Sequence, residues 1–159
     1  MGAVCEIYNA TIPTTTGAWT EELESLEERV AWFHRQLADA MPVLVAVDDD
    51  TADGGVVGFA TYGEFRDNRK WPGYRFTVEH SIHVRDTHHG QGIGRSLLWA
   101  LIERARADGM HVMVAAVDAE NVGSLAFHER LGFREVGRLP QTGRKFDRWL
   151  DLVFLQIEL

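Results

Sequence analysis

The sequence predicts an α/β or α+β domain built on a mixed β-sheet. Short β-branched runs alternate with longer segments of helical periodicity, and turn-forming residues separate the two kinds of segment. The chain has 159 residues, of which 45% are hydrophobic, and this is enough for one domain with its own core. We find no repeat, low-complexity tract or linker, so residues 1–159 are expected to form a single domain.

The first half predicts two helices followed by a hairpin. Residues 3–11 fit a short helix, and residues 25–28 (SLEE) form a capping-box pattern that starts a second helix. This helix ends before Pro42, and its apolar residues have helical spacing, at Leu26, Val30, Phe33 and Leu37. Residues 43–47 and 56–62 predict two hairpin strands joined by turn-forming residues 48–55. The polar stretch 64–73 is expected to be a surface loop.

The second half predicts four further strands and two helices. Residues 74–84 form the longest strand candidate, with one ionisable face and one face that is apolar except for His80. A glycine-rich turn at 88–94 leads into a helix that ends at Gly109, with an apolar side formed by Leu97, Leu98, Leu101, Ile102 and Ala105. A strand (111–117), a helix (122–131) and two strands (133–139 and about 148–157) complete the domain.

Charge and cysteine content narrow the class of protein. The net charge of −8 argues against a general nucleic-acid binder and gives no reason to expect binding to anionic membranes. Cys5 is the single cysteine, so an internal disulfide cannot form, and a reducing compartment is the simplest interpretation. Residues 1–6 lack the pattern of a signal peptide. We therefore expect a soluble, cytoplasmic protein.

The glycine turn has two possible interpretations. Backbone N–H groups in such a loop, at the start of a helix, are suited to hold a phosphate group. The third glycine of the dinucleotide fingerprint is missing, because Leu97 takes its place, and the Gly-Lys-Ser/Thr of nucleotide hydrolases is absent. The alternative is a tight left-handed turn with no ligand.

Two motifs resemble the signature of the GNAT N-acetyltransferases. Residues 89–94 (HGQGIG) occupy the place of that family's Gln/Arg-x-x-Gly-x-Gly/Ala loop. Further along, the family's Asn, small residue, Tyr and Gly-Phe correspond to Asn121, Ser124, His128 and Gly132-Phe133. The resemblance implies the GNAT fold, a twisted mixed sheet of about six strands flanked by helices, and acetyl transfer from acetyl-CoA to a primary amine in a ternary complex.

The chain more narrowly resembles the phosphinothricin and methionine sulfoximine acetyltransferases. The matching segments span nearly its whole length: residues 6–9, 15–19, 42–45, 76–81, 111–115 and 145–151. Such relatives carry a further strand before the segment that matches Glu6–Asn9, so the chain is either truncated or forms a sheet that is one strand short. His89 departs from the family's Gln or Arg, and we expect function to survive because main-chain amides hold the pyrophosphate.

The resemblance also implies which residues bind acetyl-CoA and act on the amine. The cofactor-binding residues would be Ile82, His83, Val84, His89, Gly90, Gln91, Gly92, Ile93, Gly94, Arg95, Asn121 and Ser124. Glu79 is the candidate base, or alternatively the partner of Arg75 or another arginine in an ion pair. The N–H of Val84 or its neighbour would polarise the carbonyl group. His128 either protonates the leaving sulfur or only shapes the pocket.

The acceptor amine would lie among Arg66, Arg75, Glu79, His80 and Ser81, with the arginines binding a carboxylate. A zinc site at His83, His88 and His89 is disfavoured by their spacing, so no metal is expected. The competing functions are acetylation of a peptide N-terminus or a polyamine, and a catalytically silent acetyl-CoA-binding module. The resemblance further implies a homodimer, in which residues 145–149 would meet the partner.

Overall fold

A computed structural model describes residues 1–48 and 55–159 of the chain. Two helices come first, and strands and helices then alternate. The elements are α1 (Gly2–Thr11), α2 (Leu26–Ala38), β1 (Val43–Val47), β2 (Val56–Glu64), β3 (Thr77–Val84), α3 (Ile93–Ala107), β4 (Val112–Asp118), α4 (Val122–Arg130), β5 (Arg134–Lys145) and β6 (Arg148–Glu158). Most of the expected turn at 48–55 lies outside the described residues.

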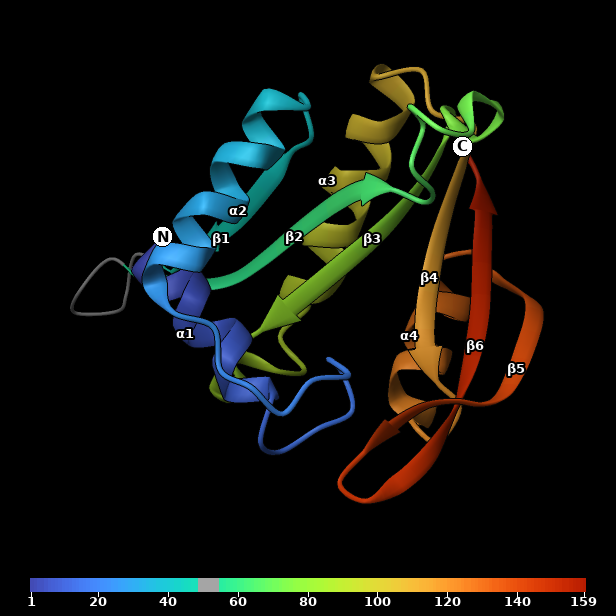
Figure 1. The fold of residues 1–159 in the computed structure, drawn as a ribbon. Helices are drawn as coiled ribbons and strands as arrows, with labels where there is room; N and C mark the ends of the chain where they lie inside the picture. The colour runs from blue at the N-terminus through green and yellow to red at the C-terminus, as the bar shows by residue number, and fades with distance from the viewer. Residues whose placement is uncertain (49–54) are drawn as a thin grey trace.

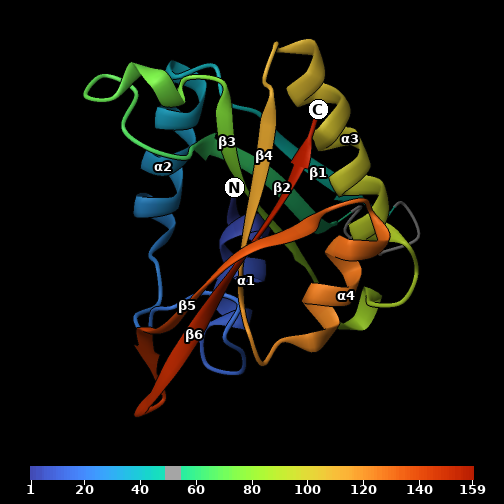
Figure 2. The ribbon, with the colours of Figure 1, turned by 90° about the vertical axis from the view of Figure 1, so that its right-hand side faces the viewer.

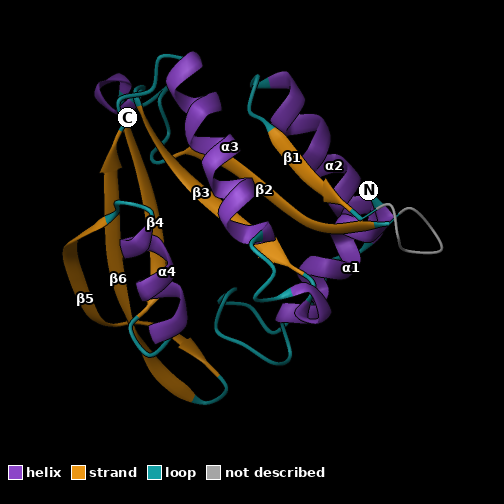
Figure 3. Cartoon of the chain, turned by 180° about the vertical axis from the view of Figure 1, so that it is seen from behind, coloured by secondary structure: helices purple, strands orange, loops and turns teal. Residues whose placement is uncertain are grey.

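The described strands form one mixed, six-stranded sheet in the order β1-β2-β3-β4-β6-β5. All neighbours are antiparallel except β3 and β4, which pair in parallel only over Thr77–Glu79 and Val112–Val114. Beyond those residues the two strands diverge, and this opens a gap in the middle of the sheet (Figure 1). Helices α1 and α2 cover one face, whereas α3 and α4 cover the other (Figure 3).

The main core lies between α3 and the sheet, as the leucine spacing predicts. Leu98, Leu101 and Ile102 are fully buried and pack with Met113 and Leu155 of the sheet. Burial of each such side chain contributes about 1.5–3 kcal/mol to folding. This packing fixes the start of α3, and therefore the glycine turn, relative to β3.

Helix α2 begins at the predicted capping box, but its buried face differs from the predicted one. The Ser25 hydroxyl accepts from the Glu28 N–H at 3.2 Å, and the Glu28 carboxylate accepts from the Ser25 N–H at 2.7 Å. Leu26 and Leu37 are exposed, whereas Arg29 is buried. Its guanidinium lies 4.1 Å from the Tyr8 ring centre, and this contact turns the helix toward α1.

Two predicted strand boundaries are wrong. Residues 74–76 do not extend β3, because Pro72–Tyr74 form a 3₁₀ turn, a conformation that proline favours in its first position. Strand β5 runs beyond the predicted residue 139 as far as Lys145, across irregular pairing between Leu139 and Gly143. Phe146 and Asp147 form the turn of the hairpin, with φ angles of 51° and 58°. Glycine or asparagine usually occupies such positions, so the sequence did not indicate this turn.

Candidate active site

The divergence of β3 and β4 creates a cleft with two described cavities. The larger, of about 930 Å³, lies beside the glycine turn and the starts of α3 and α4. Its lining includes every predicted cofactor-binding residue except His83 and Gln91. The smaller, of about 260 Å³, lies between residues 80–84 of β3 and residues 115–118 of β4. The loop after α1 contributes Thr15, Thr16 and Gly17 to the smaller cavity.

The glycine turn leaves its backbone open to a ligand. Gly92, which caps α3, and Gly90 have φ angles of 85° and 76°, in the left-handed region that favours glycine. No atom lies within 4 Å of where a Cβ would stand at either residue. The unpaired N–H groups of the first turn of α3 carry the positive end of the helix dipole. The turn therefore fits the pyrophosphate of acetyl-CoA.

Three side chains of the turn, those of His89, Arg95 and Gln91, make different contacts. The His89 ring donates to the Val84 carbonyl at 2.9 Å, so this residue fastens the turn to the end of β3. Arg95 is exposed and lines the larger cavity, where its positive charge would attract an anionic ligand. The Gln91 amide donates to the Thr87 carbonyl at 3.3 Å instead, away from the cavity.

Glu79 occupies the last paired position of β3 before the strands separate. Its side chain is half-buried, and burial raises the pKa of its carboxyl group above the ordinary value, while the nearby charge of Arg66 has a smaller lowering effect. The predicted alternative was an ion pair of Glu79 with Arg75 or another arginine, and Arg75 makes other contacts. The Arg75 guanidinium donates to the Pro72 carbonyl at 3.0 Å and lies over the Phe76 ring.

His80 and His128 form a buried pair on the opposite face of β3. Their Nε2 atoms lie 3.2 Å apart, and both rings contact Phe133. The His128 Nδ1 donates to the Ser124 carbonyl at 2.7 Å, so in the neutral ring Nε2 accepts from His80. Burial lowers the pKa of His80 to about 3 and that of His128 below its ordinary value. Both rings are therefore neutral near pH 7.

The remaining predicted residues separate into edge and surface positions. Asn121 lines both cavities, and its side-chain oxygen accepts from the Ser124 N–H at 3.0 Å as the cap of α4. The His83 ring stacks on Phe59, and burial lowers the pKa of His83 to about 4. Ser81 is exposed at the cleft. Arg66 is exposed, and its guanidinium lies over the Phe65 ring.

Within the described part of the chain, we find no group of three or more His, Cys, Asp or Glu side chains placed to hold a metal ion. Of the histidines considered for zinc, His88 lies 3.3 Å from Asp48, and His89 contacts Val84 as described above. A membrane span is likewise not found, since no described helix has the length and apolar character to cross a bilayer.

Comparison with known proteins decides the family. The model of the Acetyltransferase (GNAT) family matches residues 4–133. The chain belongs to this family. It is 49% identical to the L-methionine sulfoximine/L-methionine sulfone acetyltransferase of Pseudomonas aeruginosa, covering 98% of this chain and 87% of that protein. It is 34% identical to the phosphinothricin N-acetyltransferase of Alcaligenes faecalis, covering 97% and 75%.

A solved structure supplies the fold and the cofactor for comparison. An acetyltransferase of Salmonella typhimurium, solved with its cofactor acetyl-CoA, superposes with a TM-score of 0.89 at 40% identity, covering 98% of this chain and 86% of that one. The GNAT fold, the use of acetyl-CoA and N-acetyltransferase activity, each predicted from the sequence, are thereby confirmed for this GNAT chain.

Two residues at the cleft, Thr16 and Asp118, were not identified from the sequence, and the burial of Lys145 was not anticipated. The Thr16 hydroxyl donates to the buried carboxylate of Asp118 at 2.5 Å. Lys145 is 1% exposed, although it was predicted to face a partner subunit. Residues 12–25 carry no periodic pattern, and Thr15, Thr16 and Ala18 contact residues more than 100 positions away. A single sequence contains no local signal for such contacts.

Proposed function

We propose that this GNAT enzyme acetylates the α-amine of a small amino-acid-like substrate such as methionine sulfoximine, methionine sulfone or phosphinothricin. The observation that carries the proposal is the position of Glu79, a half-buried carboxyl group of raised pKa at the point where β3 and β4 separate. The Glu79 side chain lies on the same face of β3 as the side chain of Ser81, and Ser81 lines the smaller cavity. The named relatives act on the first two compounds and on the third, respectively.

The chemistry requires few groups from the protein. Acetyl-CoA supplies an activated acetyl group as a thioester. We assign to Glu79 the removal of a proton from the substrate ammonium, directly or through water, so that the nitrogen lone pair can form the new N–C bond as the C–S bond breaks. CoA leaves as its thiolate, and the second proton that the new amide nitrogen loses converts the thiolate to the thiol through solvent. We assign to the N–H of Val84, at the free edge of β3, a hydrogen bond to the carbonyl oxygen as negative charge develops there.

Substrate orientation is assigned to the arginine on the loop after β2. Arg66 is close enough to Glu79 to lower its pKa, so a substrate carboxylate held by Arg66 would bring its neighbouring amine toward the base. Arg75 contacts its own loop, which makes Arg66 the stronger candidate of the two.

For His128 the geometry supports the second alternative, in which it shapes the pocket. Its Nδ1–H is engaged by the Ser124 carbonyl and its Nε2 by His80, so the neutral ring has no proton directed at the cleft. Its lowered pKa opposes the charged form that a general acid needs. We propose that the His80–His128 pair fixes α4, and with it Asn121, against β3.

A thiol-release assay tests the proposed function. Purified protein with acetyl-CoA is offered the three amino-acid analogues, a peptide with a free N-terminus and a polyamine. We expect thiol release with the amino-acid analogues. Reaction with the peptide or polyamine alone would favour the corresponding alternative substrate. Thermal stabilisation by acetyl-CoA without release for any amine would favour the silent binding module.

We also propose that the enzyme is a cytoplasmic homodimer that uses the β5–β6 hairpin as an interface. Phe146 and Trp149 are 40% and 61% exposed at this hairpin, and large apolar side chains exposed together often mark an interface. The free thiol of Cys5 fits a reducing compartment. Sedimentation of the wild type and of Trp149→Ser tests the dimer. A monomeric wild type would contradict it.

A further inference from the structure

Lys145 is buried in an unusual environment. Its side chain is 1% exposed, and its ammonium donates to the Thr15 carbonyl at 2.7 Å and to the Ala18 carbonyl at 2.6 Å. Burial lowers the pKa of the amine, with a smaller opposing effect from the charge of Glu21. Removing an ammonium group from water is costly unless its donors find acceptors, and here two main-chain oxygens from one loop accept two of its three N–H groups, while the Phe146 ring centre lies 4.8 Å from the nitrogen.

Further contacts fasten the same loop across the opening of the sheet. The Thr16 hydroxyl reaches Asp118 at the end of β4, and the Phe146 N–H donates to the Glu21 carboxylate at 3.1 Å. The Trp19 ring packs so closely on Gly143 that a Cβ there would overlap it. Figure 2 shows the loop after α1 beside the end of the β5–β6 hairpin.

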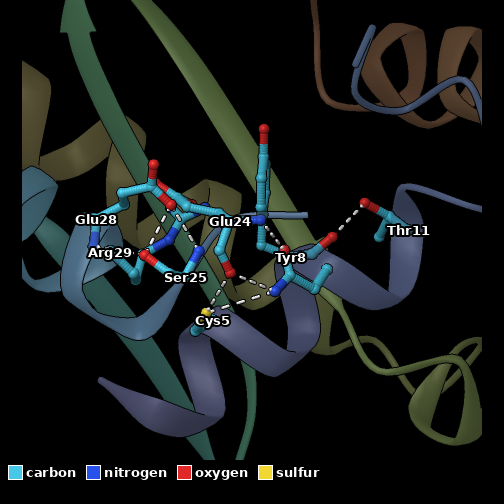
Figure 4. A network of polar contacts seen from close by, with 8 residues as sticks. Cys5, Tyr8, Thr11, Glu24, Ser25, Glu28 and Arg29 are labelled. Carbon is cyan, nitrogen blue, oxygen red and sulfur yellow. Dashed lines mark hydrogen bonds and ion pairs between the residues drawn. The ribbon is translucent and has the colours of Figure 1, made fainter. Parts of the chain in front are cut away.

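The other end of the segment is fixed where it meets α2. The Asn9 side chain donates to the Glu24 carbonyl at 2.7 Å and accepts from the Glu24 N–H at 3.0 Å. Arg29 forms an ion pair with the Glu24 carboxylate, and Figure 4 shows this network between α1 and the start of α2. Residues 12–24 are thus held by α1 and α2 at one end and by the second half of the sheet at the other.

The loop borders the part of the cleft where the acceptor is expected. Thr15, Thr16 and Gly17 line the smaller cavity and are not part of the lining of the larger cavity assigned to acetyl-CoA. Residues 80–84 of β3, which follow Glu79, and residues 115–118 of β4 also line the smaller cavity, which adjoins the larger one at Ile82, Val84, His89, Asn121 and Ser124. A shift of the loop would therefore change the space available to the amine and leave the pyrophosphate site unchanged.

We propose that Lys145, together with Thr16, is a positioning residue that holds residues 12–20 as a fixed wall of the acceptor end of the cleft. Lys145 does not touch the reacting atoms. It acts through the carbonyl groups of Thr15 and Ala18, and through them it sets the affinity for the amine. This inference rests on the proposed function, since it concerns how the same site binds its acceptor.

Kinetics of Lys145→Met test the proposal, because methionine keeps the length of the side chain and removes its donors. We expect the KM for methionine sulfoximine to rise about tenfold or more, because the loop loses the charged hydrogen bonds that hold it. The KM for acetyl-CoA should stay within about twofold. Lys70→Met is the matched control, since Lys70 is exposed, and it should alter neither constant. A purely structural role would lower the Tm and the active fraction without changing the acceptor KM.

Substitution of Thr16 provides a second test, because it removes no side chain from the hydrophobic core. Thr16→Val removes the hydroxyl that reaches Asp118 and should raise the acceptor KM, whereas Thr16→Ser keeps the hydroxyl and should restore it. Unchanged acceptor KM values in Thr16→Val and in folded Lys145→Met would overturn the inference. A wild-type enzyme inactive on all three amino-acid analogues would instead overturn the proposed function.

Discussion

Replacing Glu79 by glutamine is expected to lower activity and raise stability through the same cause, the partial burial of its carboxyl group. A general base contributes about 10²- to 10⁴-fold to the rate, which corresponds to about 3–5 kcal/mol of barrier. Because burial raises the pKa of Glu79, its acidic limb in the kcat/KM profile should lie above the ordinary glutamate range. That limb should be absent from Glu79→Gln, while titration of the substrate amine remains in both proteins.

The stability effect has a definite sign. A carboxyl group whose pKa is raised by folding favours its protonated form in the native state, so its charged form destabilises the fold. The wild type should lose stability as the pH rises from the ordinary pKa of glutamate, 4.5, through the raised value, whereas the glutamine variant should not. Glu79→Gln should therefore unfold at a higher Tm at neutral pH, and this advantage should vanish near pH 4.

Two assays decide the matter together: thiol release across the pH range, and thermal unfolding at pH 4 and pH 7.5. The matched control is Glu27→Gln on the exposed first turn of α2, which should change neither the rate nor the Tm appreciably. Near wild-type turnover of Glu79→Gln at all pH values would refute the assignment of the base. A lower Tm at pH 7.5 would refute the reasoning about burial.

Two further predictions concern the turn and the core. Gly92→Ala forces a residue with a Cβ to adopt a φ of 85°, so it should raise the KM for acetyl-CoA and cost about 1–2 kcal/mol of stability, while the KM for the amine is unchanged. An unaltered acetyl-CoA KM would show that the turn does not bind the cofactor. Tyr62→Phe removes the buried hydroxyl that donates to Asp108 and should lower the free energy of unfolding by about 1–3 kcal/mol in a denaturant titration. Wild-type stability, or a change in kcat, would contradict this structural role.

The elements of the fold were predictable where periodicity or capping chemistry is strong. The leucines of α3 and the capping box of α2 are local patterns, and the structure confirms both. Local patterns fail where a distant contact sets the conformation. Arg29 is buried because Tyr8, Trp32 and Phe59 surround its guanidinium, and no helical spacing rule anticipates a buried arginine.

The site residues also differ in whether a local sequence pattern predicts them. The glycine turn and Asn121 were recognisable because a phosphate-binding turn and a helix cap impose residue types at fixed spacing. The pairing of His80 with His128 joins residues 48 positions apart, so the sequence showed only one polar residue on an apolar face. Lys145 was predicted to meet a partner because the resemblance implied a homodimer, whereas the contact that buries it in this chain comes from the loop after α1.

The short parallel junction between β3 and β4 has a consequence for how the domain responds to its ligands. In the described sheet, three residue pairs join β1–β3 to β4–β6, so few main-chain bonds resist separation of the two halves. A molecule that forms hydrogen bonds with the free edge of β3 and also contacts the half formed by β4–β6 links the two halves where they share no main-chain hydrogen bonds. Because such a molecule binds the folded chain and not the unfolded one, it stabilises the folded state in proportion to the logarithm of its concentration. The resistance of this enzyme to unfolding is thus expected to follow the supply of acetyl-CoA in its surroundings.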